Sequence, residues 1–294
     1  MLDFTLDSYK SLINRLTNNL FSDTSSANNI IFRHDVDKMP FNSLQISKIE
    51  YDFKLIGIYY FRIVPQSNNP KIIEQIASLG HEIGYHYEDL TLCKGNLDEA
   101  IRSFEKNLKY FRQFYPVKTI CMHGSPLSKY DNRQLWEKYS YKDFGIEFEP
   151  YLDMNFTRVF YLTDTGRRWD GESVSVRDKV SVSHAEPTAA KGNRYSVIGG
   201  EERAERREER VEEIVGMTKD GRLKVYRDEN RILRHNFHST FDIIRAAEEK
   251  ILPDHMMITV HPQRWTNNPV LWTKELVMQS IKNQMKRILV KKHL

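Results

Sequence analysis

Two acidic residues separated by a single position are the first sign of chemistry in this sequence. Asp35 and Asp37 stand at the end of the run FRHDVD, directly after several apolar residues. Alternate residues of an extended segment share a face, so both carboxylates lie on the same side. Such a pair can divide the work, one carboxylate binding a cation and the other accepting a proton. Taken alone, Asp-x-Asp is more typical of loop and capping residues.

Histidines mark the ends of two other apolar runs. His86 lies near the end of one run, where it is either a metal ligand or a hydrogen-bonded core imidazole. His81, at the opposite end of the same run, is expected to be structural. His261 closes an apolar run just before Pro262. Because imidazole exchanges protons near neutral pH, His261 is a candidate proton donor.

These residues must be positioned by an alternation of short apolar runs and amphipathic segments. The runs predicted as strands are 29–36, 55–64, 81–87, 117–122, 159–163 and 256–260. The segments predicted as helices are 71–79, 97–114, 131–139, 241–249 and 270–290. Pro70 and Gly80 stand where the first of these helices is expected to begin and end. The alternation predicts parallel strands joined by right-handed crossovers, as an open doubly wound sheet or a closed barrel.

Five polar segments follow predicted strands and are expected to converge, because the carboxyl ends of parallel barrel strands meet on one face. They are His34-Asp35-Val36-Asp37, His86-Tyr87-Glu88-Asp89, His123-Gly124-Ser125, Asp164-Thr165-Gly166 and His261-Pro262. The sequence therefore predicts one composite site built from five strand ends.

Composition narrows the class of protein. The 294 residues are 40% hydrophobic and 29% charged, which is enough apolar mass for a core. The net charge is only +4, and basic runs interleaved with aromatic residues are absent, so nucleic-acid binding is not expected. With no signal-like start and no apolar run of about 18 residues, the chain is expected to be cytoplasmic without a membrane span. The two cysteines, Cys93 and Cys121, are expected to be reduced core residues.

One charged segment departs from the alternating pattern. Between positions 181 and 235, 23 of 55 residues are charged, which predicts an insertion into one domain formed by 1–180 and 236–294. The insertion is expected to be a helix plus a hairpin, or partly disordered. The helix 270–290 ends in basic residues such as Lys286 and Arg287. They fit either an anionic surface or the usual cations of a helix C-terminus, and we prefer the latter.

Three runs together resemble a known family. Residues 32–37 (FRHDVD), 80–86 (GHEIGYH) and 258–261 (ITVH) are similar to the polysaccharide deacetylases with NodB homology, or carbohydrate esterase family 4, in an HDVD-type subgroup. The resemblance covers about 29–265 outside the charged insertion, and 122–126 and 161–169 look like site loops of members associated with surface glycans. It implies an α/β fold, specifically a distorted (β/α)7-type, NodB-like barrel. It also implies a divalent metal ion, zinc in many members, that helps to remove N-acetyl groups from amino sugars.

The resemblance assigns roles residue by residue. Asp35 corresponds to the general base and His261 to the general acid, while Asp37 and His86 correspond to metal ligands. The segment from Asp164 supplies residues that orient the catalytic groups or bind substrate, namely Asp164, Arg167, Arg168 and Trp169. Aromatic side chains such as Tyr87, Trp169 and Trp265 either stack on sugar rings or are ordinary core packing, and the sequence favours neither alternative.

The family places a second metal histidine four residues after the first, where this chain has Leu90. Since a hydrolytic zinc site uses about three protein ligands, another residue must supply the third. The candidates are Glu88, His123 and His238, and we favour His123.

Three functions follow. The first is a metal-dependent hydrolase that removes an N-acetyl or similar N-acyl group from an amino sugar or glycan, acting on a non-peptide C–N amide bond in surface-polysaccharide metabolism. The second is a non-catalytic glycan-binding or assembly protein with a degenerate metal site. The third is a hydrolase of a non-sugar amide, because a fold does not fix the substrate.

Overall fold

The computed structural model describes residues 1–22, 29–124, 128–156, 158–169, 237–253 and 255–292. The chain divides into two compact units, one formed by Met1–Val180 with Asn236–Leu294 and the other by Ser181–His235. The second unit, which holds the predicted charged insertion, lies outside the described residues. All of the described residues belong to the first unit.

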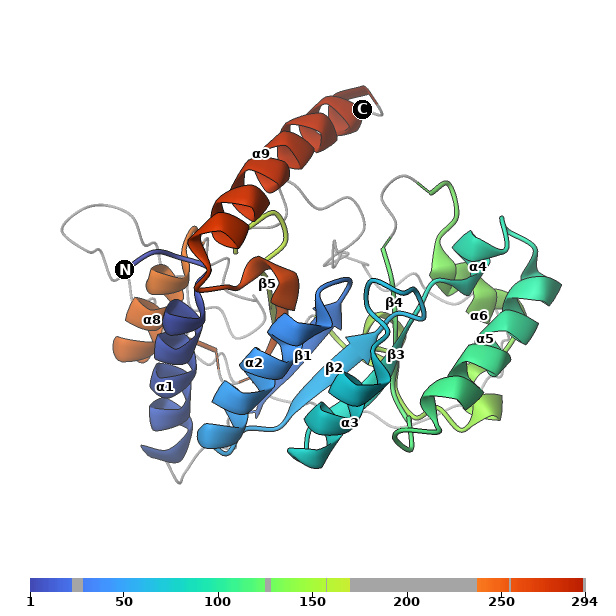
Figure 1. Cartoon of the computed structure of the whole chain (residues 1–294), viewed down its shortest axis with the longest axis horizontal. Coiled ribbons are helices and arrows are strands. Elements are labelled where there is room, and N and C mark those ends of the chain that lie inside the picture. Colours follow the sequence, from blue (N-terminus) through green and yellow to red (C-terminus); the bar gives the residue numbers. More distant parts are fainter. Residues whose placement is uncertain (23–28, 125–127, 157, 170–236, 254, 293–294) are drawn as a thin grey trace, which may run out of the picture. The chain divides into compact units, whose positions relative to one another are not determined.

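Six parallel strands form a single curled sheet, a half-barrel in the order β4-β3-β2-β1-β6-β5 (Figure 1). The strands are β1 (Asn29–Val36), β2 (Gly57–Phe61), β3 (Glu82–Tyr87), β4 (Ile120–Met122), β5 (Phe160–Thr163) and β6 (His255–Val260). Each run predicted as a strand contributes one of them, so the alternating parallel α/β pattern is confirmed. A short parallel bridge between Thr119 and Phe148 lies beside β4. The seven-stranded NodB-like barrel remains an expectation.

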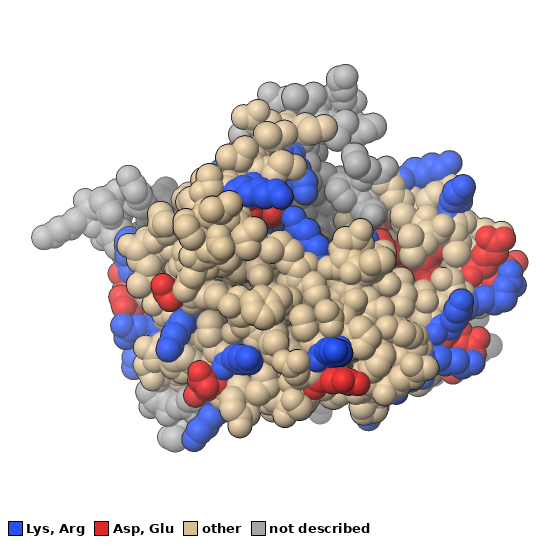
Figure 2. Space-filling model, viewed as in Figure 1, with Lys and Arg blue, Asp and Glu red and all other residues tan. Residues whose placement is uncertain are grey.

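Helices connect and cover the strands. The α-helices are α1 (Leu6–Ser22), α2 (Pro40–Asp52), α3 (Pro70–Ser78), α4 (Asp89–Leu92), α5 (Leu97–Phe111), α6 (Leu135–Lys138), α7 (Pro150–Asp153), α8 (Thr240–Glu248) and α9 (Pro269–Lys292). The 3-10 turns are η1 (Asn132–Gln134), η2 (Tyr141–Phe144) and η4 (Pro262–Arg264). Most of the face seen in Figure 2 is uncharged, and acidic and basic side chains are scattered over it, mainly toward its edges. Within the described part of the chain, no helix has the length and apolar character needed to cross a bilayer.

Local sequence explains both a predicted helix and an overlooked one. α3 begins at Pro70, the Asn69 side chain accepts a hydrogen bond from the Ile72 backbone, and Gly80 follows the helix at a φ of 89°. Left-handed backbone of this kind favours glycine, so the predicted start and end are confirmed. α2 has no apolar stripe, because polar side chains such as Ser47 and Glu50 occupy its buried face. The helical period of hydrophobicity is therefore missing from the sequence.

A fully buried polar cluster joins α1 and α2 to the sheet. Glu50 on α2 accepts hydrogen bonds from Tyr9 at 2.6 Å and Tyr59 at 2.5 Å. The same carboxylate lies 2.9 Å from Nε2 of His34, whose ring stacks on Tyr59. Burial raises the pKa of Glu50, but His34 and the two tyrosine hydroxyls lower it overall. A buried charge is tolerated only when it is paired and hydrogen-bonded in this way.

His81 is structural, as the sequence suggests. Its Nδ1 accepts a hydrogen bond from the Gly57 backbone at 3.1 Å, and its Nε2 donates to the Ser47 carbonyl at 2.9 Å. Both ring nitrogens are thus used to tie β2 to α2.

Replacing Glu50 should cost more stability than any surface acid. Glu50→Ala leaves the two tyrosine hydroxyls and His34 without their acceptor, so we expect the free energy of unfolding to fall by about 3–5 kcal/mol. Glu74→Ala on exposed α3 surface should change it by less than about 0.5 kcal/mol. Because the pKa of Glu50 is lower in the folded chain, the difference from wild type should shrink as the pH falls below the ordinary glutamate range. Urea titrations at several pH values would measure this, and equal effects at the two positions would contradict it.

Candidate functional site

The end of β1 carries a buried ion pair. The Arg33 guanidinium donates two hydrogen bonds to Asp35, from Nε at 2.8 Å and from Nη2 at 2.6 Å. The two residues are two positions apart on one strand, so their side chains share a face of the sheet. Burial raises the pKa of the Asp35 carboxyl, but Arg33, with help from His86, lowers it to about 2. Asp35 is therefore an ionised carboxylate held in a fixed orientation.

Three ligand atoms converge beside this pair. Oδ1 of Asp37 lies 3.6 Å from Nε2 of His86 and 3.4 Å from Nε2 of His123. Asp37 follows β1, His86 belongs to β3 and His123 follows β4, so parallel strands bring all three to the same edge of the sheet. Together these side chains could hold a metal ion. Asp37 and His123 remain partly exposed, which leaves the group accessible from the surface.

The hydrogen bonds of the two imidazoles direct their Nε2 atoms toward Asp37. Nδ1 of His86 donates to the Cys121 carbonyl at 2.9 Å, and Nδ1 of His123 donates to the Glu88 carboxylate at 3.0 Å. In a neutral imidazole, a proton on Nδ1 leaves the lone pair on Nε2. Acceptors of this kind orient histidine ligands around metals in many proteins.

Among the described residues, only one of the two oxygens of the Asp37 carboxylate has a hydrogen-bond partner. Oδ2 accepts a hydrogen bond from Gln263 at 3.0 Å, whereas Oδ1 is buried and has no hydrogen-bond partner among the described residues. Burial raises the pKa of Asp37, but the His86 and His123 imidazoles lower it well below its ordinary value. An ionised, buried oxygen that faces two imidazole nitrogens suits a cation.

Leu90, four residues after His86, lies in a helix and not on the strand β3. β3 ends at Tyr87, and the chain then enters α4, in which Leu90 is buried. His123, the residue favoured from the sequence, lies in the cluster instead. Glu88 is not one of its members, because its carboxylate binds the Arg62 guanidinium at 2.8 Å and orients His123.

A second ion-paired group lies where β5 and β6 end. Nδ1 of His261 lies 2.6 Å from Oδ1 of Asp164, and the His261 backbone donates to the other oxygen at 3.0 Å. Arg264 also donates to Oδ1, at 2.5 Å. Burial raises the pKa of Asp164, but Arg264 and His261 lower it overall. His261 in turn lowers the pKa of both Asp35 and Asp37, which puts the two groups within electrostatic reach.

Asp164 contacts His261, and the arginine that pairs with its carboxylate is Arg264 and neither Arg167 nor Arg168. Arg264 lies three residues after His261 in the turn η4, and this proximity is the signal the sequence analysis missed. Arg167 instead packs its guanidinium over the rings of Phe4 and Trp272. Arg168 lies 3.4 Å from Nδ1 of His238, so His238 belongs to that neighbourhood and not to the group around Asp37.

The aromatic residues considered for sugar stacking are part of the core, so ordinary packing is the alternative that holds for these buried rings. Trp169 is 3% exposed and donates to Thr240, and Trp265 is fully buried and donates to Asp164 at 2.8 Å. Tyr87 is fully buried as well. Cys121 is a core residue, as expected, whereas Cys93 is only half-buried.

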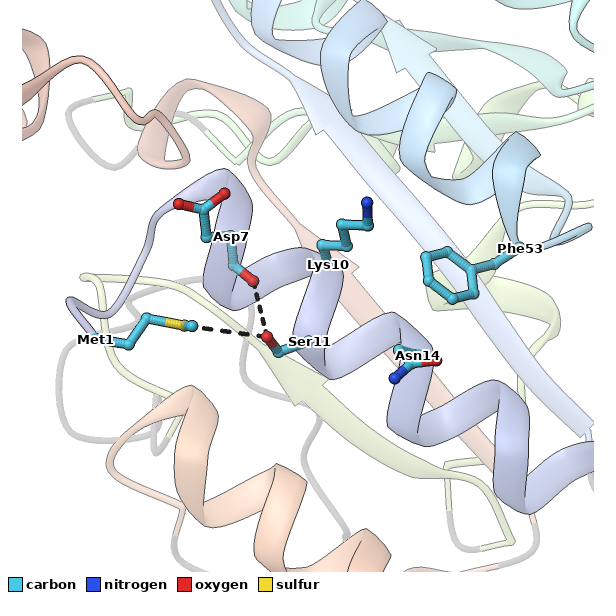
Figure 3. A pocket seen from close by; sticks show the side chains of 6 residues that line it. All are labelled: Met1, Asp7, Lys10, Ser11, Asn14 and Phe53. Atoms are coloured by element: carbon cyan, nitrogen blue, oxygen red, sulfur yellow. Dashed lines mark hydrogen bonds between the residues drawn. The ribbon is translucent and has the colours of Figure 1, made fainter.

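A shallow hollow elsewhere on the surface has no part in this site. Figure 3 shows it beside α1, lined by Met1, Asp7, Lys10, Ser11, Asn14 and Phe53. Its lining shares no residue with the groups at the strand ends. Comparison with protein-family models, curated proteins and solved structures gives no match to this chain.

Glu88 should control the protonation of one imidazole and leave the other unchanged. In metal-free protein at alkaline pH, we expect His86 and His123 both to carry their proton on Nδ1, because the acceptors face that atom. Glu88→Ala should remove this preference from His123 only. Nitrogen-15 NMR of the imidazole rings distinguishes the tautomers, with Glu82→Ala at the other end of β3 as the control. An Nε2 proton on either ring in the wild type would contradict the assignment.

Proposed function

We propose that this chain is a metal-dependent hydrolase that removes an N-acetyl or similar N-acyl group from an amino sugar or glycan. The observation that carries the proposal is the convergence of Oδ1 of Asp37 with Nε2 of His86 and of His123. Tetrahedral zinc with bonds of about 2.0–2.1 Å would separate its ligand atoms by roughly 3.3–3.4 Å. The distances of 3.4 and 3.6 Å agree with that geometry.

Zinc is the ion we assign to this group, since two imidazoles and one carboxylate are donors that it commonly takes. When bound, such an ion polarises an amide carbonyl and makes its water ligand more acidic. The three residues bind it, while Glu88 and the Cys121 carbonyl hold the two imidazoles in place.

Asp35 is the proposed general base. Its carboxylate lies 3.9 Å from Nε2 of His86, next to the proposed ligands, and is ionised at any physiological pH. A carboxylate with so low a pKa is a weak base toward free water, so Asp35 would accept a proton from a water that a metal held by Asp37, His86 and His123 would make more acidic. Arg33 engages both oxygens and thereby fixes the direction from which the proton is accepted.

His261 is the proposed general acid. The Asp164 carboxylate holds its Nδ1, which leaves Nε2 to give a proton to the departing amine. The proposed base lies on β1 and the proposed acid directly follows β6, and these two strands are neighbours in the sheet.

The resemblance of the three sequence runs to the polysaccharide deacetylases supports the N-acyl sugar as substrate. The presence of His123 beside Asp37 favours a working centre over the degenerate glycan-binding alternative, because it supplies the ligand that Leu90 cannot. Surface-polysaccharide metabolism is the setting that the subgroup resemblance suggests.

Metal binding should depend on Asp37. We expect purified wild-type protein to bind one zinc ion, and Asp37→Ala to weaken its zinc affinity by about 100-fold or more, because a charged ligand is lost. Glu82→Ala, on β3 but away from the cluster, should bind as tightly as wild type. Competition with a chromogenic chelator measures all three affinities. A wild-type chain that takes up no divalent ion would remove the basis of the proposed function.

Turnover should depend on Asp35 independently of metal affinity. Asp35→Asn keeps the shape of the side chain but cannot accept the proton, so we expect kcat to fall by about 10²–10⁴-fold with nearly unchanged zinc affinity. Acetate release from a panel of N-acetylated amino sugars and their oligomers provides the assay. Full activity in this variant would exclude Asp35 as the base.

A further inference from the structure

Helix α9 contacts the rest of the unit through polar groups. Glu275 pairs with Lys38 at 3.2 Å, and Asn283 donates to the Gly166 carbonyl at 2.9 Å. Trp272 donates through its indole nitrogen to the Asp3 carbonyl, and Gln279 is buried. These positions recur at steps of three and four residues, so they form one face of the helix.

Six exposed apolar side chains of α9 lie close together on its surface, while Leu276, Ser280 and Gln284 are exposed outside this group. Their exposed fractions in the group of six are 72% for Val270, 37% for Leu271, 51% for Val277, 45% for Met278, 50% for Ile281 and 56% for Met285. At 3.6 residues per turn, these six residues fall within about 120° of the helix circumference. We call them the apolar stripe. Figure 1 shows α9 running away from the sheet toward the C-terminus, and Figure 2 shows uncharged surface along it with basic side chains nearby.

This arrangement reverses the usual orientation of a surface helix. An amphipathic helix normally buries its apolar face and exposes its polar face. α9 docks with polar side chains and presents six apolar ones to the outside. A contiguous exposed apolar surface of this kind marks a site of interaction with another protein or a membrane.

The charge of the helix identifies the partner. The basic residues of α9 are Lys274, Lys282, Lys286, Arg287, Lys291 and Lys292. Its single acidic residue, Glu275, is neutralised by Lys38. A second copy of the chain would set the same excess of positive charge against it, which opposes self-association through this helix. An anionic surface is attracted instead.

We propose that α9 binds the surface of a bilayer that contains anionic phospholipid. The apolar stripe enters the boundary between headgroups and acyl chains, and the cations contact the lipid phosphates. Lys274 falls within the stripe, where its aliphatic stem can lie along the lipid while the ammonium group reaches the headgroups. The helix lies in the plane of the surface and does not cross the bilayer.

Vesicle flotation with the full-length chain tests this proposal. We expect the protein to float with vesicles of equal parts phosphatidylcholine and phosphatidylglycerol, and to stay unbound with phosphatidylcholine alone. High salt should weaken the binding, because it screens the cations. The double variant Val277→Gln with Ile281→Gln should bind roughly tenfold more weakly or worse. Ile56→Gln removes a side chain that is 70% exposed before β2 and serves as the matched control.

A complementary variant tests the electrostatic part. Lys274→Glu with Lys282→Glu keeps the apolar stripe but reverses two charges, and we expect a similar loss of binding to the anionic vesicles. Because both substituted positions are exposed, the fold should be unaffected.

Three results would overturn the proposal. The first is absence of wild-type binding to the anionic vesicles, or binding that the double variant retains in full. The second is a wild-type dimer, seen by analytical ultracentrifugation, that the double variant dissociates. The third is a fall in thermal stability in the double variant but not in Ile56→Gln, which would mean that the chain itself covers the stripe. Zinc content and acetate release, measured in the same samples, report on the proposed function separately.

Discussion

The buried ion pair between Arg33 and Asp35 is the interaction on which the candidate site depends. A lone carboxylate in this position would be neutralised or would destabilise the fold, because an unpaired buried charge is costly. A single strand solves the problem by presenting both partners on one face, two residues apart. The Asp35 carboxylate is thereby charged, rigid and close to His86 before any ligand arrives. The same principle recurs at Asp164, where Arg264 compensates the charge.

Much of the fold could be predicted because its strands are continuous apolar runs. All six appear within a few residues of their predicted limits, and β1 has the predicted limits at both ends. The convergence of His123 with Asp37 followed from the rule that parallel strands end at one edge. α2 escaped prediction because tertiary contacts, centred on Glu50, bury its polar side chains. A periodicity argument detects only helices that bury apolar faces.

The partners of the candidate-site residues were harder to predict than the residues themselves. Arg33 lies two positions from an acid, a spacing that is common on protein surfaces, and Arg264 has no acid near it in the sequence, so neither stands out until the fold is known. Trp265 illustrates the opposite case. A tryptophan near a proposed sugar site suggests stacking, yet its indole is used to satisfy the second oxygen of Asp164. The sequence shows which side chains are chemically able to react. The hydrogen bonds of the folded chain decide which of them can still contact a ligand.

Alternate side chains of β1 have different roles, and this limits how the motif FRHDVD can be moved to another protein. Arg33 and Asp35 face the site, while His34 between them pairs with Glu50 on the covering helix. Grafting FRHDVD onto another parallel sheet would bring in an imidazole that needs an acid and two tyrosines behind the sheet. Without those residues, the strand that carries Asp35 and Asp37 would be unstable in its new position. A graft therefore needs both the strand and the buried residues that pack behind it.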